Sequence, residues 1–363
     1  MPTVQVNLPH TRYEVVVENK SIQTLIQRLE DVGLTGKKCA VITDSNVAPH
    51  YLATVQEALV SGGYETSTHI IAAGESSKSL SVVEEVSREM ITARHDRASF
   101  VIALGGGVVG DLAGFVASIF FRGIPFVQIP TTIVSQVDSS VGGKTGVNTP
   151  EGKNLIGAFH QPKLVLIDPE MLRTLPEREY LEGYGEVIKH ACIRDAAMLA
   201  QLETMDLSTV PPSADMLARN IGIKARVVEE DEKETSGTRA LLNFGHTIGH
   251  GIEASVPYGE LLHGEAIALG MLAALHLSVT HAGLPAADAA RVNRVLERFS
   301  LPTVLPDSIT TEQIVAKMLT DKKFSKGQIH FVLLSGLGSA YVSADLTMAD
   351  LEHAIDALRQ PLS

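Results

Sequence analysis

The amino-acid sequence predicts an α/β protein in which an N-terminal domain built on a parallel sheet precedes a mainly α-helical domain. In the first part of the chain, short apolar strands alternate with amphipathic helices, as in parallel sheets covered by helices. After Leu172 the strand pattern gives way to helical periodicity. A length of 363 residues is also sufficient for about two domains. We therefore divide the chain into residues 1–172 and 173–363.

The elements of the first domain follow in order along the chain. Alternating polar and apolar residues predict two opening strands, and the apolar residues of Ser21–Val32 recur at helical spacing. Glycine or polar residues separate the elements that come next. Further strands are predicted at 37–43, 65–71, 99–104, 125–129 and 164–168, and helices at 47–62, at 80–94 and after the glycines at 105–107.

The segment Ser135–Asn154 interrupts this alternation. It is rich in glycine, serine, aspartate and lysine and has no helical period. A loop of this length in a compact domain is usually functional or disordered. Because Lys144, Lys153 and Asn154 suit anion binding, we interpret the segment as a functional loop.

Helical periodicity dominates the second domain. A late pair of strands is predicted before the last helix. The predicted helices are 177–203, 213–230, 262–281, 285–299 and 348–359, and the predicted strands are 329–334 and 339–342.

Composition limits the classes of function. The net charge of −12 argues against non-specific nucleic-acid binding. Cys39 and Cys192 show no metal-type spacing, which fits a reducing compartment, and the N-terminus lacks the features of a secretory signal. The apolar stretches 103–121 and 266–284 contain glycines, Asp111 or histidines, so we expect buried elements and not membrane spans. The sequence thus predicts a cytoplasmic protein.

Three histidines lie close together in the second domain. His246 and His250 are four residues apart and share a helix face, and His263 opens the next apolar helix. On spacing alone, His246, His250 and His263 are candidate ligands of one divalent metal; the alternative is a set of helix-cap and surface histidines. The surrounding glycines cost helix stability and therefore indicate close packing or ligand approach. These glycines are Gly245, Gly249, Gly251 and Gly264.

A glycine-rich turn joins a predicted strand to a helix at Gly105–Asp111. Its G-x-G-x-x-G spacing lets backbone amides approach a pyrophosphate at a helix N-terminus. The motif by itself also fits a tight turn that packs helix against sheet. Asp44 and Glu75 each follow a predicted strand and are candidates to hold ribose hydroxyls.

Charged residues elsewhere carry weaker signals. Glu186 and Lys189 are neighbours on a helix face, where a surface ion pair is the simpler interpretation. Lys224 and Arg239 likewise fit solvated surface charges.

Taken together, the motifs resemble those of the 3-dehydroquinate synthase family, in the same order over nearly the whole chain. The resemblance rests on Gly105–Asp111, Phe121–Gly123, Pro130–Thr132, Val137–Asn148, Gly152–Asn154, Glu186–Lys189, Leu242–His250, His263–Glu265 and Asp321–Lys323.

The resemblance implies an N-terminal NAD-binding domain and a C-terminal helical domain that binds a divalent metal, Zn²⁺ or Co²⁺. It implies Glu186, His246 and His263 as ligands, and it makes His250 a group that supports the site or transfers protons. Two imidazole nitrogens and one carboxylate oxygen, with a position left open, suit catalytic zinc. This ligand set replaces the one that spacing alone indicated.

Further residues match the family's site positions. The NAD-contacting positions are Asp44, Asn46, Glu75, Lys78, Gly107, Val108, Val109, Gly110, Asp111, Thr131, Thr132, Lys144 and Lys153. The substrate-binding positions are Arg122, Lys144, Lys153, Asn154, Lys224, Arg239, Asn243 and one of Lys322 and Lys323. The catalytic positions are Asp138, Lys189, His250 and Glu234.

The implied substrate is 3-deoxy-D-arabino-heptulosonate 7-phosphate. The resemblance implies transient oxidation by NAD, phosphate elimination, reduction by the same cofactor, ring opening and an intramolecular aldol closure. It also implies a homodimer in which Arg122 serves the neighbouring subunit. Alternatives are a cyclase acting on sedoheptulose 7-phosphate, a metal-dependent glycerol or alcohol dehydrogenase, and a non-catalytic nucleotide-binding protein.

Two positions depart from the family pattern. One extra residue lies between Glu234 and Arg239, which puts the role of Glu234 in question. Gly185 stands where alanine is usual before the metal-binding glutamate.

Overall fold

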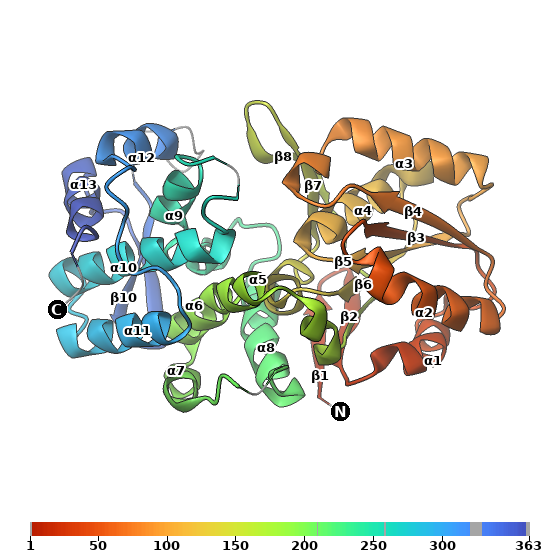
Figure 1. Cartoon of the computed structure of the whole chain (residues 1–363), viewed down its shortest axis with the longest axis horizontal. Helices are drawn as coiled ribbons and strands as arrows, with labels where there is room; N and C mark the ends of the chain where they lie inside the picture. Colours follow the sequence, from red (N-terminus) through yellow and green to blue (C-terminus); the bar gives the residue numbers. More distant parts are fainter. Residues whose placement is uncertain (1, 209, 258, 320–328, 361–363) are drawn as a thin grey trace. The chain divides into compact units, whose positions relative to one another are not determined.

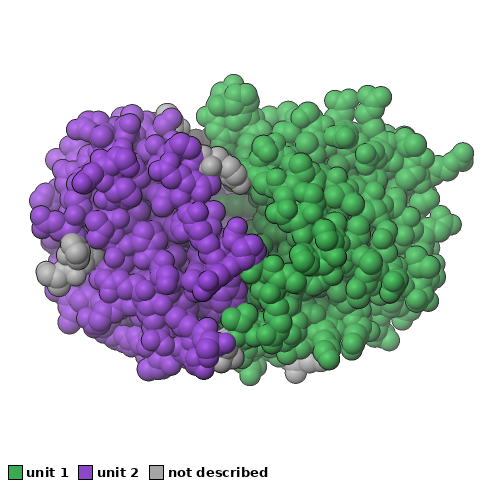
Figure 2. Space-filling model, viewed as in Figure 1, with its two compact units in different colours: residues 1–175, 210–229 green, residues 176–209, 230–363 purple. Residues whose placement is uncertain are grey.

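The computed structural model describes residues 2–208, 210–257, 259–319 and 329–360. Its contacts divide the chain into two compact units, coloured separately in Figure 2. Unit 1 contains residues 1–175 and 210–229, and unit 2 contains residues 176–209 and 230–363. The predicted division at residue 172 had assigned 210–229 to the second domain. Those residues belong to unit 1 because Asn7 donates backbone and side-chain hydrogen bonds of 2.6 and 3.1 Å to Glu229, and Lys224 pairs with Asp138 at 2.8 Å.

Unit 1 is built on a seven-stranded sheet (Figure 1). The strand order is β1-β2-β9-β6-β5-β3-β4, and every pair except β1–β2 is parallel. This confirms the predicted parallel α/β fold. The strands are β1 (Thr3–Leu8), β2 (Thr11–Val17), β3 (Cys39–Asp44), β4 (Thr66–Ile71), β5 (Phe100–Gly105), β6 (Phe126–Pro130) and β9 (Leu164–Ile167).

Helices cover both faces of this sheet. Along β3, Cys39 and Val41 face one apolar core while Ala40 and Ile42 face the other, because side chains alternate along a strand. Helices α1 (Leu25–Asp31) and α2 (Ala48–Ser61) close the first core, and α3 (Leu80–Thr92) and α4 (Gly107–Ile119) close the second. Unit 1 also holds α8 (Ala214–Glu230) up to residue 229.

The segment predicted as a loop is ordered. It forms a π-helical turn, Ser135–Ser139, and an antiparallel hairpin of β7 (Lys144–Thr149) and β8 (Gly152–Phe159). The prediction was wrong because most of β8 is exposed and so lacks the apolar alternation of a half-buried strand. Glycines permit the close pairing: a Cβ on Gly157 would lie 2.1 Å from the carbonyl oxygen of Thr145.

Unit 2 is mainly helical. The single helix predicted at 177–203 is three helices, α5 (Glu177–Glu182), α6 (Tyr184–Arg194) and α7 (Ala196–Thr204). The chain turns at Asp195, whose carboxylate caps α7 by accepting a 3.0 Å hydrogen bond from the amide of Met198. The other helices and the late strands are α9 (His246–Glu253), α10 (His263–His281), α11 (Ala286–Arg298), α12 (Thr311–Met318), α13 (Met348–Ala357), β10 (Phe331–Gly336) and β11 (Ser339–Ser343).

Helix α10 is the centre of unit 2. It packs against α6, α9, α11, α13 and β10, and it is apolar and buried for most of its length. A helix that is apolar all round belongs in a protein core. Helix α12 was not predicted; its signal is a short capping box in which Thr310 and Gln313 bond reciprocally. Short 3₁₀ helices lie at Ser21–Thr24, Glu75–Ser77, Phe120–Arg122, Pro169–Thr174 and Arg239–Asn243.

None of the helices among the described residues combines the length and apolar character needed to cross a membrane.

Candidate active site

Three side chains in unit 2 form a candidate metal centre. Glu186 lies in the first turn of α6, and His246 and His263 are the first residues of α9 and α10. Oε1 of Glu186 lies 3.4 Å from Nε2 of His246 and 3.6 Å from Nε2 of His263. The structure thus brings together the three residues that the resemblance indicated, with one potential ligand atom of each within 4.8 Å of the others.

The second nitrogen of each histidine is oriented by a neighbour. Nδ1 of His246 lies 3.1 Å from the carbonyl oxygen of Phe244, and Nδ1 of His263 lies 3.5 Å from Oε2 of Glu253. Contacts of this kind fix a metal-binding imidazole with its proton on the far nitrogen. Both Nε2 atoms are therefore left to face Glu186.

The carboxylate of Glu186 is divided between two roles. Its Oε2 accepts a hydrogen bond from Lys189, while its Oε1 faces the two histidines. Both charged side chains are almost fully buried. Ligand atoms that bind tetrahedral zinc at about 2.1 Å lie roughly 3.4 Å from one another. The observed spacing and the two-nitrogen, one-oxygen donor set fit such an ion.

A second acidic and imidazole set shares His263. His250, Glu253 and His263 also place potential ligand atoms within 4.8 Å of one another. In that set Glu253 already contacts Nδ1 of His263. The carboxylate of Glu253 is also more exposed than that of Glu186, so its charge has less need of a positive ion beside it. We therefore favour the Glu186 set, with His250 beside it. The ring centre of His250 lies 5.1 Å from that of His246.

Close glycine contacts set the spacing of the three helices. A Cβ on Gly270 of α10 would lie 2.0 Å from the carbonyl oxygen of Gly245, next to His246. A Cβ on Gly264 would lie 1.9 Å from the carbonyl oxygen of Glu182, and one on Gly185 would lie 2.8 Å from that of Gly264. Real Cβ atoms do not approach backbone so closely, so Gly264 has the packing role that the sequence indicated, and Gly185 and Gly270 have the same role.

The protonation of the two histidines differs. Burial, and then the charge of Lys189, lowers the pKa of His246 well below its usual value. For His263, burial acts in the same direction, but hydrogen bonds to Glu186 and Glu253 prevail and raise its pKa to about 10. A metal therefore competes with a proton on His263, and metal binding will release protons.

In unit 1, polar side chains gather where the parallel strands end. Asp44 ends β3, and its Oδ1 accepts hydrogen bonds of 2.8 and 3.0 Å from the amides of Asn46 and Val47. Glu75 follows β4 and accepts a 2.8 Å hydrogen bond from Asn148. The carboxyl ends of parallel strands are where open α/β sheets bind ligands.

Lys78 connects three segments at this edge. Its ammonium group donates hydrogen bonds of 2.6 Å to Asp111 on α4 and 2.5 Å to Asn154 on β8. The backbone carbonyl of Lys78 also accepts a 2.8 Å hydrogen bond from the amide of Asn148. Burial raises the pKa of Asp111, and the adjacent Lys78 limits that rise. Lys78 thus holds the hairpin β7–β8 to the start of α4.

The glycine turn fits the phosphates of a dinucleotide. Gly106 precedes the first residue of α4, a 13-residue helix whose N-terminal amides favour anions. A Cβ on Gly107 would lie 3.2 Å from the Ser139 hydroxyl. The hydroxyl of Thr131 on the neighbouring loop is buried and lacks a hydrogen-bond partner within the described part of the chain. These observations fit NAD.

The other predicted cofactor and substrate residues fall into distinct environments. The side chain of Val109 belongs to the apolar core, so only its backbone is available, whereas Val108 and Thr132 are half-buried. Arg122, Lys144 and Lys153 are exposed on unit 1. Lys322 and Lys323 lie outside the described residues.

Lys224 and Arg239 are not solvated surface charges. Lys224 is mostly buried and lies 2.8 Å from Oδ1 of Asp138, within unit 1. Arg239, in unit 2, is 2% exposed, donates to the carbonyl oxygen of Glu232 and lies 3.7 Å from the carboxylate of Glu234. Asn243 ends the same 3₁₀ turn and is half-buried.

Asp231 organises the loop that contains the extra residue. Its carboxylate accepts hydrogen bonds from the backbone amides of Thr235 at 2.8 Å, Ser236 at 3.2 Å and Arg239 at 3.1 Å. Burial alone would raise the pKa of Asp231, but these hydrogen bonds prevail and lower it to about 2. The longer loop therefore remains fixed, with Glu234 in a left-handed conformation at φ 58°.

We expect Asp231→Asn to lower the free energy of unfolding by about 1–3 kcal/mol at pH 7. The substitution replaces one carboxylate oxygen by an NH₂ group, which cannot accept the hydrogen bond from the backbone N–H of Arg239. The ionised carboxylate has a lowered pKa, so its contribution is present above about pH 4 and is lost as pH falls toward 2. Denaturation midpoints at several pH values test this. The difference from wild type should shrink in acid, and Asp307→Asn, at a fully exposed side chain, should change little.

Sequence reasoning missed Glu253, Glu182 and Asp231 as parts of this site. Each acts through another residue: Glu182 accepts a 2.6 Å hydrogen bond from the amide of Gly264, next to His263. Burial raises the pKa of Glu182 to about 7. The only signal in the sequence was a density of acidic residues near the ligand positions.

Comparison with known proteins agrees with this geometry. The family model for the 3-dehydroquinate synthase N-terminal part matches residues 68–182, and the model for the C-terminal part matches residues 183–324. The chain belongs to the 3-dehydroquinate synthase family. It is 45% identical to the 3-dehydroquinate synthase of Pelobacter propionicus, over 94% of this chain and 96% of that protein. Identity to the Caulobacter vibrioides 3-dehydroquinate synthase is 44%, covering 96% and 97%.

A solved structure outside that activity is also similar. The 2-epi-5-epi-valiolone synthase from Streptomyces hygroscopicus subsp. jinggangensis 5008, with NAD+ and Zn²⁺ bound, superposes with a TM-score of 0.87 at 31% identity. The match covers 97% of this chain and 98% of that chain. This likeness confirms the predicted two-domain α/β fold.

Proposed function

We propose that the protein catalyses the 3-dehydroquinate synthase reaction, converting 3-deoxy-D-arabino-heptulosonate 7-phosphate to 3-dehydroquinate and phosphate. The reaction is a carbon–oxygen lyase step of the shikimate pathway to aromatic amino acids. The observation that carries the proposal is the Glu186–His246–His263 cluster in a chain 45% identical to a 3-dehydroquinate synthase over 94% of its length.

Unit 1 supplies the residues proposed for the dinucleotide and for part of the substrate. The amides at the start of α4 bind phosphates, and Asp44 and Glu75 are placed to accept from ribose hydroxyls. Lys144, Lys153, Asn154 and Lys224 supply positive charge and donors for a sugar acid phosphate. Asp138, held beside Lys224, is the acid–base group of this unit.

Unit 2 supplies the residues proposed for the metal and the proton transfers. Lys189 donates to Oε2 of Glu186, which leaves Oε1 for the ion. His250 lies beside the ligand His246, where it can accept or donate a proton at the reacting hydroxyl. Arg239 and Asn243 present a fork of donors that suits a carboxylate.

The two bound groups supply chemistry that side chains lack: NAD accepts and returns a hydride, and the divalent metal, Zn²⁺ or Co²⁺, acts as a Lewis acid. Oxidation of one ring hydroxyl acidifies the adjacent C–H, which makes loss of phosphate feasible. The residues named above orient the substrate and move its protons.

Two alternatives are weaker. A sedoheptulose 7-phosphate cyclase acts on a substrate without a carboxylate, and so would not use the donors of Arg239 and Asn243 that suit one. A glycerol or alcohol dehydrogenase does not require the lysines at 144, 153 and 224.

We expect substoichiometric NAD to support many turnovers without accumulation of NADH. The test is incubation with the heptulosonate phosphate, NAD and zinc while phosphate, absorbance of NADH and product mass are followed. One NADH per substrate consumed would instead identify a dehydrogenase, and faster turnover of sedoheptulose 7-phosphate would identify the other cyclase.

We further propose that the protein is a homodimer in which Arg122 completes the neighbouring subunit's site. Phe121 and Arg122 have positive φ values of 47° and 72°, and such strained conformations persist where the surroundings or function require them. Apolar side chains are also exposed on the same unit, as at a surface that another subunit covers. They are Ile119, Phe121, Leu155, Ile156 and Phe159.

Mixing two inactive variants tests this proposal. Equal amounts of Arg122→Ala and His263→Ala subunits should recover up to about a quarter of wild-type activity, because half of the dimers are mixed and each mixed dimer has one complete site. Subunit exchange is verified by mass. No recovery after verified exchange would mean that Arg122 acts within its own chain.

We place the reaction in the cytoplasm. Cys39 and Cys192 are both buried free thiols, which suits a reducing compartment.

A further inference from the structure

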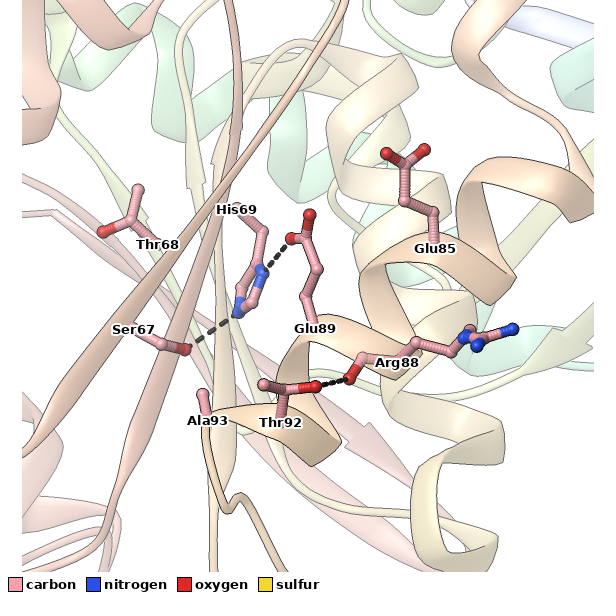
Figure 3. Close-up of a pocket in the computed structure, with 8 residues that line it drawn as sticks. All are labelled: Ser67, Thr68, His69, Glu85, Arg88, Glu89, Thr92 and Ala93. Atoms are coloured by element: carbon pink, nitrogen blue, oxygen red, sulfur yellow. Dashed lines mark hydrogen bonds and ion pairs between the residues drawn. The ribbon is translucent and has the colours of Figure 1, made fainter.

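A hydrogen-bonded row of side chains lies at the edge of the large sheet. Ser67 and His69 are two residues apart on β4, an edge strand, so they share a face, and α3 brings Glu89 to that face (Figure 3). These residues lie near the amino end of β4. Asp44 and Glu75, in contrast, lie at the carboxyl ends of β3 and β4. The row is therefore separate from the proposed dinucleotide site.

The distances are those of direct hydrogen bonds. Oγ of Ser67 lies 2.8 Å from Nε2 of His69, and Nδ1 of His69 lies 2.7 Å from Oε2 of Glu89. A second imidazole reaches the same hydroxyl: Nε2 of His95 lies 2.6 Å from Oγ of Ser67. His69 and His95 are each only 3% exposed, so both rings are held by their surroundings.

These contacts allow an arrangement of protons that activates the serine. A carboxylate accepts, so Nδ1 of His69 carries a proton, and in the tautomer with a single proton Nε2 of His69 has a lone pair. In that tautomer Ser67 donates its O–H to His69, which leaves its oxygen to accept from Nε2–H of His95. This assignment leaves Nδ1 of His95 without a proton, and that atom is buried without a hydrogen-bond partner among the described residues. Burial, and then Lys38, lowers the pKa of His95 to about 4, so the ring is neutral at pH 7.

The resulting order of donors is that of an activated serine nucleophile. Glu89 orients His69, His69 is placed to take the serine proton, and His95 donates to the serine oxygen itself. A carboxylate, an imidazole and a hydroxyl in this arrangement recur on unrelated folds, where geometry and not sequence order identifies them.

An open pocket of about 570 Å³ gives access to the row. Small side chains, Thr92 and Ala93, form part of its lining, and the carboxylates of Glu85 and Glu89 make it unfavourable for anions. The guanidinium group of Arg88 is turned away from Ser67 (Figure 3). The pocket therefore suits a short acyl group without negative charge.

We propose that Ser67, His69 and Glu89 form a second reactive site that transfers the acyl group of short, uncharged esters to water. Oγ of Ser67 forms a bond to the carbonyl carbon, the ester C–O bond breaks, and the serine proton passes through Nε2 of His69 to the leaving alcohol. Water then cleaves the acyl-serine, which gives the carboxylic acid and restores the hydroxyl. Ester and water are the only reactants.

A covalent probe tests the nucleophile directly. Treatment of the full chain with a fluorophosphonate should form a Ser67 Oγ–phosphorus bond with loss of fluoride, located by peptide mass mapping. Ser67→Ala should lose this adduct and the associated hydrolysis of p-nitrophenyl acetate. His69→Gln should slow labelling by about a hundredfold or more, since it removes the base.

Two glutamates of the same pocket provide a matched comparison. Glu89→Gln should slow labelling at least about tenfold, because it removes the charge that orients His69, whereas Glu85→Gln should stay within about twofold of wild type. Phosphate release from the heptulosonate should be unchanged in Ser67→Ala, which verifies the fold. Absence of an adduct at Ser67, or equal labelling of the Glu89 and Glu85 variants, would overturn the proposal.

Discussion

Replacement of His246 or His263 by alanine should abolish stoichiometric zinc binding and lower phosphate release by about a thousandfold or more, since a Lewis acid contributes several kcal/mol to such a reaction. Each variant removes one of the two nitrogens that face Oε1 of Glu186 at 3.4 and 3.6 Å. Zinc content per chain, measured by elemental analysis after dialysis, and initial rates of phosphate release test the expectation. Circular dichroism verifies that the chain remains folded.

His250→Ala is the matched control for this prediction. Its ring lies 5.1 Å from that of His246 but outside the favoured ligand set. We expect that variant to retain zinc and to lose between about a hundredfold and ten-thousandfold in rate, as for a general acid–base group. A His246→Ala protein that keeps full zinc, or a His250→Ala protein that loses it, would show that the ligands are His250, Glu253 and His263 instead.

Gly270→Ala should destabilise unit 2 by about 3 kcal/mol and weaken zinc binding at least about tenfold. The added Cβ would lie 2.0 Å from the carbonyl oxygen of Gly245 and 2.6 Å from the amide nitrogen of Gly249. Both contacts are to backbone, so α9 must move away from α10 and carry His246 with it. Denaturant titration and zinc competition with a chelator measure the two effects.

Gly222→Ala is the control for helical glycines. Gly222 lies within α8, and its nearest contact for a Cβ is a side-chain atom of Arg226 at an ordinary 3.6 Å. Alanine favours a helix by up to about 1 kcal/mol over glycine, so we expect equal or greater stability there and unchanged zinc binding. If Gly270→Ala behaved in the same way, the close contact would not be what sets the position of α9.

Much of the fold was predictable because most helices and strands leave a pattern in their own local sequence. Apolar strands such as Cys39–Asp44, and helix ends marked by a glycine such as Gly62, depend on the local sequence. The boundaries of these elements in the structure lie within one or two residues of the predicted ones. The hairpin β7–β8 was not predictable in this way. Its pairing depends on two glycines that let backbones approach and on Lys78, which lies more than sixty residues before Asn148 and bonds to it.

For the site, the sequence by itself determined the candidate metal ligands only through family resemblance; spacing alone selected His250 in place of Glu186. It also treated Lys189, Lys224 and Arg239 as surface charges, although all three are largely buried. Tertiary structure decided these points, because α6, α9 and α10 meet at glycine contacts that bring Oε1 of Glu186 to the histidines. Distances between residues sixty positions apart follow from how helices pack, and periodicity within one helix carries no information about that packing.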